Sequence, residues 1–582
     1  MKKIFSYLGE HPCAVGIIVL FLMIQAGCEI LLPQFTANLV DIGVQNGDME
    51  YLKGACIKMV LLSALMMGAA CGAGFVAART GAAIGRDLRG RVFRKVISFS
   101  SGEISRFSTA SLITRCTNDV QQITMVCIML LRMVLYAPVI GTAGIVMVVM
   151  SRTGMAWIIV LVVAAIIFVV MFLMRLALPK FQAMQKLVDQ LNLISREILT
   201  GIPVIRAFNR QQEEEKRFES ANMDLMKTQL FANRVMSFMM PCMMIIMNGI
   251  SVLVVWVGSY GVDQGRLQVG DMIAFITYAM MIVMAFMMIT MISIMLPRAG
   301  VAAGRINEVL GTESAVADPA EPVEIHPDEA AGEIRFEHVS FRYPNAGKDV
   351  LHDLTFTAPA HKTTAIIGGT GSGKSTVISL IPRFYDATEG RILIDGVDVR
   401  SMRQKDLRDL MGYVPQKGIL FSGTVASNLR FADDGISDDV IRMAAETAQA
   451  AEFIEAKPEG YNSPVAQNGS NISGGQRQRL AIARAVARQP KIFLFDDSFS
   501  ALDFRTDAAV RRALGEKTKD ATVVIVAQRI STIMHADRII VLDEGQIVGM
   551  GTHSELLESC SQYREIAVSQ LSEEELKGGE RS

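Results

Sequence analysis

Apolar residues are concentrated in about the first 300 positions of this 582-residue chain, where they form six long runs. The runs cover about 14–40, 54–78, 124–150, 155–177, 236–260 and 271–296. Each run, if helical, could cross the roughly 30 Å hydrocarbon core of a bilayer. One such run could be a buried core helix, but six in series with polar breaks predict six membrane spans. The first run continues without a small-residue cleavage site, so we interpret it as a span and not a signal peptide.

The polar breaks alternate in length, and basic residues favour the long ones. Short breaks follow the first, third and fifth runs, and they contain only two basic residues, Arg152 and Arg266. The long segment after the second run contains seven: Arg86, Arg89, Arg91, Arg94, Lys95, Arg106 and Arg115. Because cytoplasmic loops are enriched in Lys and Arg, the long segments and both chain ends are predicted to be cytoplasmic. The protein is thus expected in the cell membrane as a multi-pass protein.

The two long segments are predicted to be helices that continue beyond the bilayer, each with a break. The breaks lie at Ser100–Leu112 and Thr200–Gln211, and Gly201 and Pro203 are expected to interrupt the second helix. A short cross-helix at a break could press on another domain, or the segment could be a solvated helical hairpin. The pattern leaves both interpretations open.

An acidic, proline-containing stretch at 311–332 separates this half from a second domain. Ile334–Tyr343 alternates like a strand, and Tyr343 at its end could stack on an adenine or simply pack there. The stretch GGTGSGKST follows a β-branched run, TTAIIG, and precedes a predicted helix. This is the phosphate-loop pattern in its required context. Its residues are Gly368, Gly369, Thr370, Gly371, Ser372, Gly373, Lys374, Ser375 and Thr376.

These residue types suit a nucleoside triphosphate and Mg²⁺. Glycines let backbone N–H groups close around a phosphate, Lys374 can reach the β- and γ-phosphates, and Ser375 can ligate Mg²⁺. Four apolar residues followed by Asp496 predict a buried strand, and the Asp496 carboxylate at its end is expected to be a second metal ligand. A second phosphate cradle is predicted at Ser473, Gly474 and Gly475, where a turn opens a helix. Two chains packed head to tail would sandwich ATP between the first cradle of one and the second of the other.

The remaining composition changes this picture little. The net charge is −1, which gives no global field for nucleic acid, and we expect no nucleic-acid partner. The eight cysteines show no metal-ligand spacing and imply no disulfide framework. Methionines crowd the last two apolar runs, where they could be lipid-facing filler or line an adaptable binding surface. Glu29 and Arg132 lie inside apolar runs and are candidates for function, for a structural pair or for an interface position.

In combination these motifs resemble the ATP-binding cassette exporters of the half-transporter type, and the resemblance covers nearly the whole chain. It implies an all-α six-helix transmembrane domain at 1–310, the linker at 311–332, an α/β phosphate-loop ATPase domain at 333–570 and a polar tail at 571–582. It also implies ATP and Mg²⁺ as cofactors, and a second half-transporter and the bilayer as partners. The cargo, a small molecule, lipid or peptide, is not identified.

The resemblance to this family implies roles for several residues. Tyr343 occupies the adenine-stacking position, and Gln416 that of the loop glutamine that touches Mg²⁺ and the membrane domain. Ile472–Gln476 (ISGGQ) is the signature, with Ile where Leu is usual. Ser500–Asp503 (SALD) matches the loop that crosses to the partner. The two broken cytoplasmic segments match the coupling helices, of which the second reaches the partner.

The sequence departs from the family pattern at two catalytic positions and in the loop before the signature. Asp497 stands where active members have glutamate, and Gln528 where they have the switch histidine. The loop before the signature reads SPVAQNG, with Pro464 and Gln467 at places usually held by glutamate. The Asp497 carboxylate is retracted by about one C–C bond, ~1.5 Å, and a catalytic group misplaced by ~1 Å can lose on the order of 10²-fold in rate. Glutamine can donate a hydrogen bond but cannot carry a proton.

We therefore expect ATP binding with slow hydrolysis at this chain's own site. An intact signature beside a weakened site resembles the degenerate-site subunit of a heterodimeric exporter, which would complete the partner's active site. One alternative is a homodimer that turns over slowly at two equivalent sites. Another is an ATP-gated channel or sensor of the same family.

Overall fold

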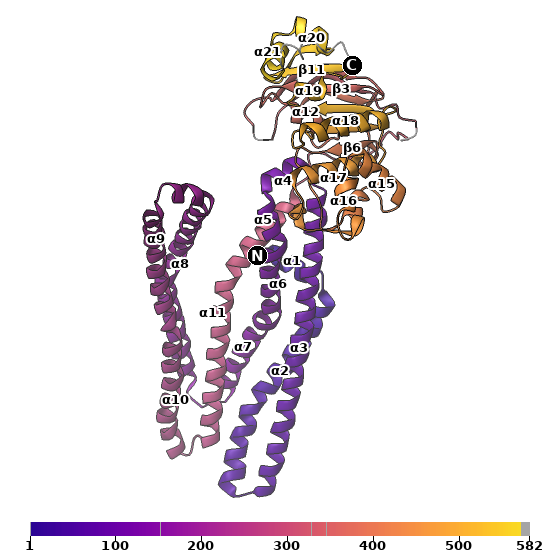
Figure 1. Cartoon of the computed structure of the whole chain (residues 1–582). Helices are drawn as coiled ribbons and strands as arrows, with labels where there is room; N and C mark the ends of the chain where they lie inside the picture. Colours follow the sequence, from indigo (N-terminus) through magenta and orange to yellow (C-terminus); the bar gives the residue numbers. More distant parts are fainter. Residues whose placement is uncertain (1, 152, 327–328, 345, 572–582) are drawn as a thin grey trace. The chain divides into compact units, whose positions relative to one another are not determined.

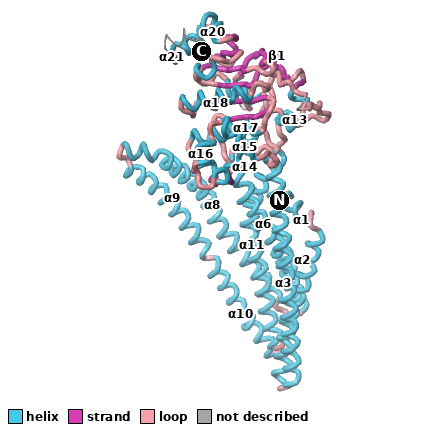
Figure 2. Tube along the Cα trace, turned by 45° about the vertical axis from the view of Figure 1, so that its right-hand side comes forward, coloured by secondary structure: helices cyan, strands magenta, loops and turns pink. Residues whose placement is uncertain are grey.

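The computed structural model describes residues 2–151, 153–326, 329–344 and 346–571, and it divides into two compact units. The first unit comprises Met1–Lys95 and Ala110–Gly311, and the second Val96–Thr109 and Thr312–Ser582. Arg152, two linker residues (Pro327 and Asp328) and residues 572–582 of the predicted tail lie outside the described residues. Among the described residues, strands occur only in the second unit (Figure 2).

The first unit consists of helices (Figure 1). They are α1 (Lys2–Gly9), α2 (Pro12–Asn38), α3 (Met49–Ile97), α5 (Thr109–Thr114), α6 (Val120–Met129), α7 (Leu135–Met150), α8 (Ala156–Ala207), α9 (Gln211–Ser237), α10 (Met239–Asp263) and α11 (Val269–Gly311). Six helical stretches are long and apolar enough to span a membrane, which confirms the predicted six spans: Pro12–Val44, Met49–Ile97, Thr109–Met150, Ala156–Ala207, Gln211–Asp263 and Val269–Ile292.

The predicted interruption at Gly201 and Pro203 is wrong, because α8 continues through both residues to Ala207. Proline lacks the N–H that would bond the carbonyl four residues earlier, here that of Leu199. Leu199 is 70% exposed, so water can satisfy this carbonyl and the helix persists. The chain instead turns at Phe208–Arg210, after which α9 begins.

Three π-helical segments interrupt the first and third spans, and each carries a charged side chain. They are η1 (Leu39–Val44), η2 (Arg115–Asp119) and η3 (Leu130–Val134). In η1, Asp41 accepts a hydrogen bond from the Gly270 N–H at 2.7 Å. In η2, Arg115 pairs with Glu308 at 2.9 Å. These bonds attach α11 to the first and third spans within this unit. Such π-bulges often mark functional positions.

The second unit is built on a six-stranded sheet of order β12-β11-β3-β10-β9-β6, in which only β12 is antiparallel. Alternate residues of β10 enter different cores: Val523 and Ile525 pack on one face, Val524 and Val526 on the other. A parallel sheet buried on both faces needs such uniformly apolar strands. Its strands are β3 (Thr363–Gly368), β6 (Met411–Val414), β9 (Ile492–Asp496), β10 (Thr522–Val526), β11 (Arg538–Asp543) and β12 (Gln546–Gly551).

After the linker, the described residues of this unit also form two smaller sheets and ten α-helices. The antiparallel sheet β2-β1-β4-β5 contains β1 (Ile334–Phe341), β2 (Leu351–Ala358), β4 (Glu389–Ile394) and β5 (Val397–Asp398), and β7 (Gly423–Thr424) pairs with β8 (Pro464–Val465). The helices after the linker are α12 (Lys374–Leu380), α13 (Gln404–Asp409), α14 (Val425–Leu429), α15 (Asp438–Thr447), α16 (Ala451–Glu455), α17 (Gly474–Ala487), α18 (Phe504–Lys517), α19 (Ile530–Ile533), α20 (His553–Ser559) and α21 (Ser561–Gln570). Together these elements form an α/β domain after the six-helix domain, as predicted.

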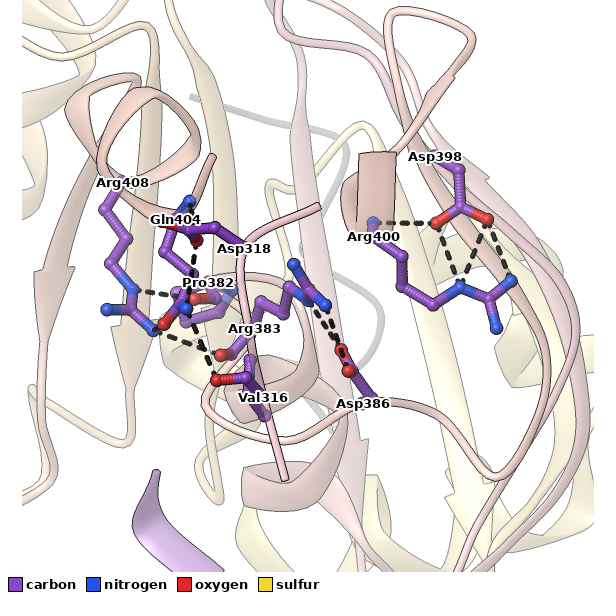
Figure 3. Close-up of polar contacts among 9 residues, drawn as sticks. All are labelled: Val316, Asp318, Pro382, Arg383, Asp386, Asp398, Arg400, Gln404 and Arg408. Carbon is purple, nitrogen blue, oxygen red and sulfur yellow. Dashed lines mark hydrogen bonds and ion pairs between the residues drawn. The ribbon is translucent and has the colours of Figure 1, made fainter. Parts of the chain in front are cut away.

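The linker is bound to the second unit by specific polar contacts. Figure 3 shows Gln404 of α13 donating its side-chain amide to Asp318 at 3.1 Å and to the Val316 carbonyl at 3.4 Å. The first cytoplasmic break forms α4 (Ser101–Phe107), whose buried Glu103 accepts the Ala315 N–H at 3.2 Å. The first predicted cross-helix is therefore attached to the start of the linker.

Candidate nucleotide site

Four neighbouring parallel strands end at one edge of the large sheet, and each contributes to the candidate site. The phosphate loop follows β3, and Asp496 is the last residue of β9. Gln416 lies two residues beyond β6, and Gln528 two residues beyond β10. Since β6, β9, β10 and β3 are adjacent and parallel, their carboxyl ends meet at one edge. Ligands of open α/β sheets bind at this edge.

The phosphate loop curls around its own lysine. Lys374 donates from Nζ to the carbonyl oxygens of Gly368 and Gly369, at 2.9 and 2.6 Å. Burial lowers the pKa of Lys374 from its ordinary value. Gly373, which precedes α12, has φ +96°, and an added Cβ would lie 2.6 Å from the Leu351 side chain. Only glycine fits at this backbone conformation. The loop carbonyls hold the Lys374 ammonium, and this cation can turn to a bound phosphate.

Two of the three predicted metal ligands, Ser375 and Asp496, lie together, whereas the third, Gln416, bonds Asp497. Ser375 donates its hydroxyl proton to Asp496 Oδ1 at 2.8 Å, although 121 residues separate them in the chain. Asp496 is 7% exposed, and burial raises its pKa, with the neighbouring Asp497 charge acting in the same direction. Hydroxyl and carboxylate oxygens are what Mg²⁺ prefers, and a divalent cation would offset the cost of this buried charge. The residues present therefore fit Mg²⁺.

The two altered catalytic positions contact each other. Asp497 Oδ2 accepts from Gln528 Nε2 at 2.9 Å and from Gln416 Nε2 at 3.2 Å. The Asp497 backbone is left-handed, with φ +47°, and its N–H donates to the Val526 carbonyl. Burial raises the pKa of Asp497, and hydrogen bonds from Gln416 and Ser500 act against that rise. One carboxylate oxygen is thus occupied by two amide donors.

Tyr343 lies beside the loop, two residues beyond the end of β1 and not at its last residue as expected. Its hydroxyl is 3.0 Å from Thr376 Oγ1, and its ring packs edge-on against Tyr385 at a centroid distance of 5.3 Å. The side chain is half-buried, which leaves part of its surface available to a ligand.

The second cradle is formed but is separate from the first. Ser473 caps α17 by accepting the Gln476 N–H, and the Gln476 side chain accepts the Ser473 N–H in return. Asp503 caps α18 by accepting the Thr506 N–H at 3.0 Å. In the part of the chain that the structure describes, no hydrogen bond joins Ser473–Gln476 to the phosphate loop.

Gln570, at the end of α21, is a residue that sequence reasoning missed. Its Oε1 accepts the Ile530 N–H and its Nε2 donates to the Gln528 carbonyl, both at 2.8 Å. The C-terminal helix therefore holds the backbone of the segment that presents Gln528 to Asp497. A lone glutamine more than 40 residues after this segment gives no signal in the sequence.

Comparison with known proteins shows similarity to ABC transporters in both halves of the chain. The model of the ABC transporter transmembrane region matches residues 15–286, and the ABC transporter model matches residues 351–500. An uncharacterized ABC transporter ATP-binding protein of Mycobacterium tuberculosis is 41% identical over 559 residues, 96% of each chain. YfiB of Bacillus subtilis, also described as an uncharacterized ABC transporter ATP-binding protein, is 38% identical over 574 residues, 99% of each chain.

More distant relatives are named for a transport function. The ATP-dependent lipid A-core flippase of Pseudomonas aeruginosa is 32% identical over 600 residues, covering 99% of this chain and 97% of that one. The structure is similar to that of a bacterial Atm1-family ABC exporter with ATP bound, with a TM-score of 0.79, 27% identity and coverage of 97% and 99%. The six spans and these relatives indicate a multi-pass membrane protein with a cytoplasmic nucleotide-binding domain. The chain belongs to the ABC transporter family, as an ATP-driven exporter with its transmembrane and ATP-binding domains fused in one polypeptide.

Proposed function

We propose that this exporter subunit binds MgATP at a weakly hydrolytic site and supplies its signature to the hydrolytic site of a different half-transporter. The observation that carries the proposal is the contact between Asp497 and Gln528. Both residues differ from the family's catalytic pattern, and they bond each other.

In this proposal the chain keeps all the residues that would bind ATP and Mg²⁺. Lys374 and the loop backbone would hold the phosphates, and Tyr343 would support the adenine. Ser375, Gln416 and Asp496 would hold Mg²⁺, which neutralises phosphate charge when it is bound. Each of these side chains lies at the same sheet edge or directly beside it.

In this proposal the site activates the attacking water poorly. A general base must reach the proton that it removes, at about 2.6–3.2 Å. The Asp497 carboxylate is ~1.5 Å short of a glutamate's reach, and one of its two oxygens is already occupied by two amide donors. Gln528 has no proton to transfer. These features support slow hydrolysis without loss of binding.

The signature supports a role toward a partner. Ser473, Gly474 and Gly475 form a helix N-terminus with backbone donors, and Gly474 has open space where a Cβ would be. A phosphate can approach such a site closely. Head-to-tail pairing would place this N-terminus over the partner's nucleotide, while the partner's signature covers this chain's ATP. Differential ATP affinity for the closed and open states would then drive transport.

ATPase measurements on the full chain in lipid nanodiscs test the proposal. We expect the chain alone to bind ATP and hydrolyse it slowly, and to turn over briskly when copurified with a half-transporter that carries Glu and His at these two positions. Brisk hydrolysis by the chain alone would contradict the proposal and favour the homodimer. ATP-dependent accumulation of cargo in vesicles would separate an exporter from an ATP-gated channel or sensor.

A further inference from the structure

A polar cluster lies inside the first and third membrane spans, and the nucleotide chemistry does not use it. Gln25 and Glu29 are four residues apart on α2 and therefore lie on one face of the helix. Tyr136 of α7 donates its hydroxyl proton to the Glu29 carboxylate. Tyr278 of α11 donates to the Ile30 carbonyl at 3.1 Å, which attaches the sixth span beside the cluster.

The cluster has hydrogen-bond acceptors that no described residue fills. A carboxylate can accept about four hydrogen bonds, whereas Glu29 accepts one, from Tyr136, in the described part of the chain. Within the same described residues, the Gln25 amide makes none. Both side chains are half-buried, so a ligand can reach them. Unfilled acceptors in hydrocarbon are costly, so such side chains usually mark a functional site.

Arg132 does not neutralise this carboxylate. It lies one turn before Tyr136, yet no ion pair within 4.0 Å joins it to Glu29 among the described residues. Its guanidinium carbon is instead 3.7 Å from the point where a Cβ at Gly74 of α3 would lie. Arg132 therefore extends toward the second span, and within the described part of the chain no cation pairs with the Glu29 carboxylate.

We propose that Gln25 and Glu29 bind the protonated amine of an amphipathic cation within the membrane, beside the Tyr136 hydroxyl that contacts the Glu29 carboxylate. The ammonium N–H groups would donate to the Glu29 carboxylate and the Gln25 side-chain oxygen, and the apolar part of the ligand would pack along the apolar first span. Charge-assisted hydrogen bonds are about twice as strong as neutral ones, so the protonated amine should contribute most of the binding specificity. This site is independent of whether the nucleotide site hydrolyses ATP.

Binding of a matched pair of probes to the full chain in zwitterionic nanodiscs tests this site. The first probe is a dansyl-tagged octanediamine with one free amine, and the second is its N-acetylated, neutral form. Fluorescence titration without ATP, corrected with empty nanodiscs, gives both affinities. We expect the natural chain to bind the amine at least about tenfold more tightly, and Glu29→Gln to reduce that preference to about twofold with the neutral probe unchanged.

Three further variants make the result decisive. Glu50→Gln removes an exposed acid at the start of α3 and should leave the preference intact. Tyr136→Phe keeps the carboxylate and should retain the preference even if Glu29→Gln fails to fold. Gln25→Leu should reduce it about threefold or more. No amine preference in the natural chain, a preference that survives in Glu29→Gln, or its loss in Tyr136→Phe would each overturn the proposal. Because no ATP is present, slow or fast hydrolysis at the nucleotide site leaves this outcome unaffected.

Discussion

The part of the nucleotide site that would hold phosphate and metal differs from the part that would activate water. Lys374, Ser375 and Asp496 match the phosphate-loop pattern, and the fold joins Ser375 to Asp496 at 2.8 Å. Asp497 and Gln528 depart from the pattern and bond each other at 2.9 Å. Asp496 and Asp497 are neighbours at the end of β9, yet Asp496 bonds Ser375 whereas Asp497 bonds Gln416 and Gln528. Since the two carboxylates have different partners, hydrolysis can be weakened while binding is kept.

The largest effect is expected at the signature. Gly474→Asp in this chain should reduce ATP hydrolysis by the copurified pair more than about 100-fold, because a carboxylate at this helix N-terminus repels a phosphate. An added Cβ at Gly474 meets no atom within 4 Å, so the domain should still fold. Steady-state ATPase of the pair is the measurement.

Two control variants show what causes the loss of ATP hydrolysis in Gly474→Asp. Gly474→Asn has nearly the same size without the charge, and it should retain much more activity than Gly474→Asp. Lys374→Ala should abolish ATP binding at this chain's own site yet slow the pair by only severalfold. If Lys374→Ala were as damaging as Gly474→Asp, both sites would hydrolyse ATP and the separation would fail.

A second prediction restores the missing catalytic groups. Asp497→Glu with Gln528→His should raise hydrolysis at this site by roughly 10- to 100-fold, since the carboxylate gains reach and the imidazole can carry a proton. Single-turnover hydrolysis by the chain alone measures the gain. The same double variant combined with Lys374→Ala should show none. An unchanged rate in a folded, ATP-binding double variant would contradict the roles of these two residues.

A third prediction concerns pH. Burial raises the pKa of Asp496, so the folded protein binds this proton more tightly than the unfolded chain does. The resulting stability is fully present below the ordinary carboxyl pKa and is lost as pH rises through the raised value. Asp496→Asn should therefore raise the unfolding temperature by a few degrees near neutral pH, with the difference vanishing in acid. Asp520→Asn, at an exposed position, is the control, and equal shifts would contradict the burial argument.

The smallest effect is expected from Gln570. Gln570→Ala should increase amide hydrogen exchange at Ile530 about fivefold, because one hydrogen bond contributes about 1 kcal/mol. Exchange followed by mass spectrometry of the 528–530 segment measures it. Val568→Ala on the same helix, at a side chain 60% exposed, should leave the exchange rate unchanged. Equal protection in both variants would show that the C-terminal helix does not hold the Gln528 segment.

The membrane half illustrates where local patterns mislead. The six runs identify six spans because crossing hydrocarbon demands about 20 apolar residues in a row. Gly201 and Pro203 suggest a helix end, yet α8 passes through both, because water can satisfy an exposed carbonyl. Likewise Glu29 is visible as an isolated acid, but its bond to Tyr136, 107 residues away, depends on how two spans pack.

Local chemistry was sufficient to predict the family, the spans and the phosphate loop, because those features depend on neighbouring residues along the chain. Folding alone decided that Asp497 and Gln528 contact each other, that Gln570 holds the Gln528 segment, and that Ser375 reaches Asp496. These contacts join positions between 31 and 121 residues apart. The order of strands in a sheet sets such distances, and that order is determined by packing throughout the domain and not by any one segment.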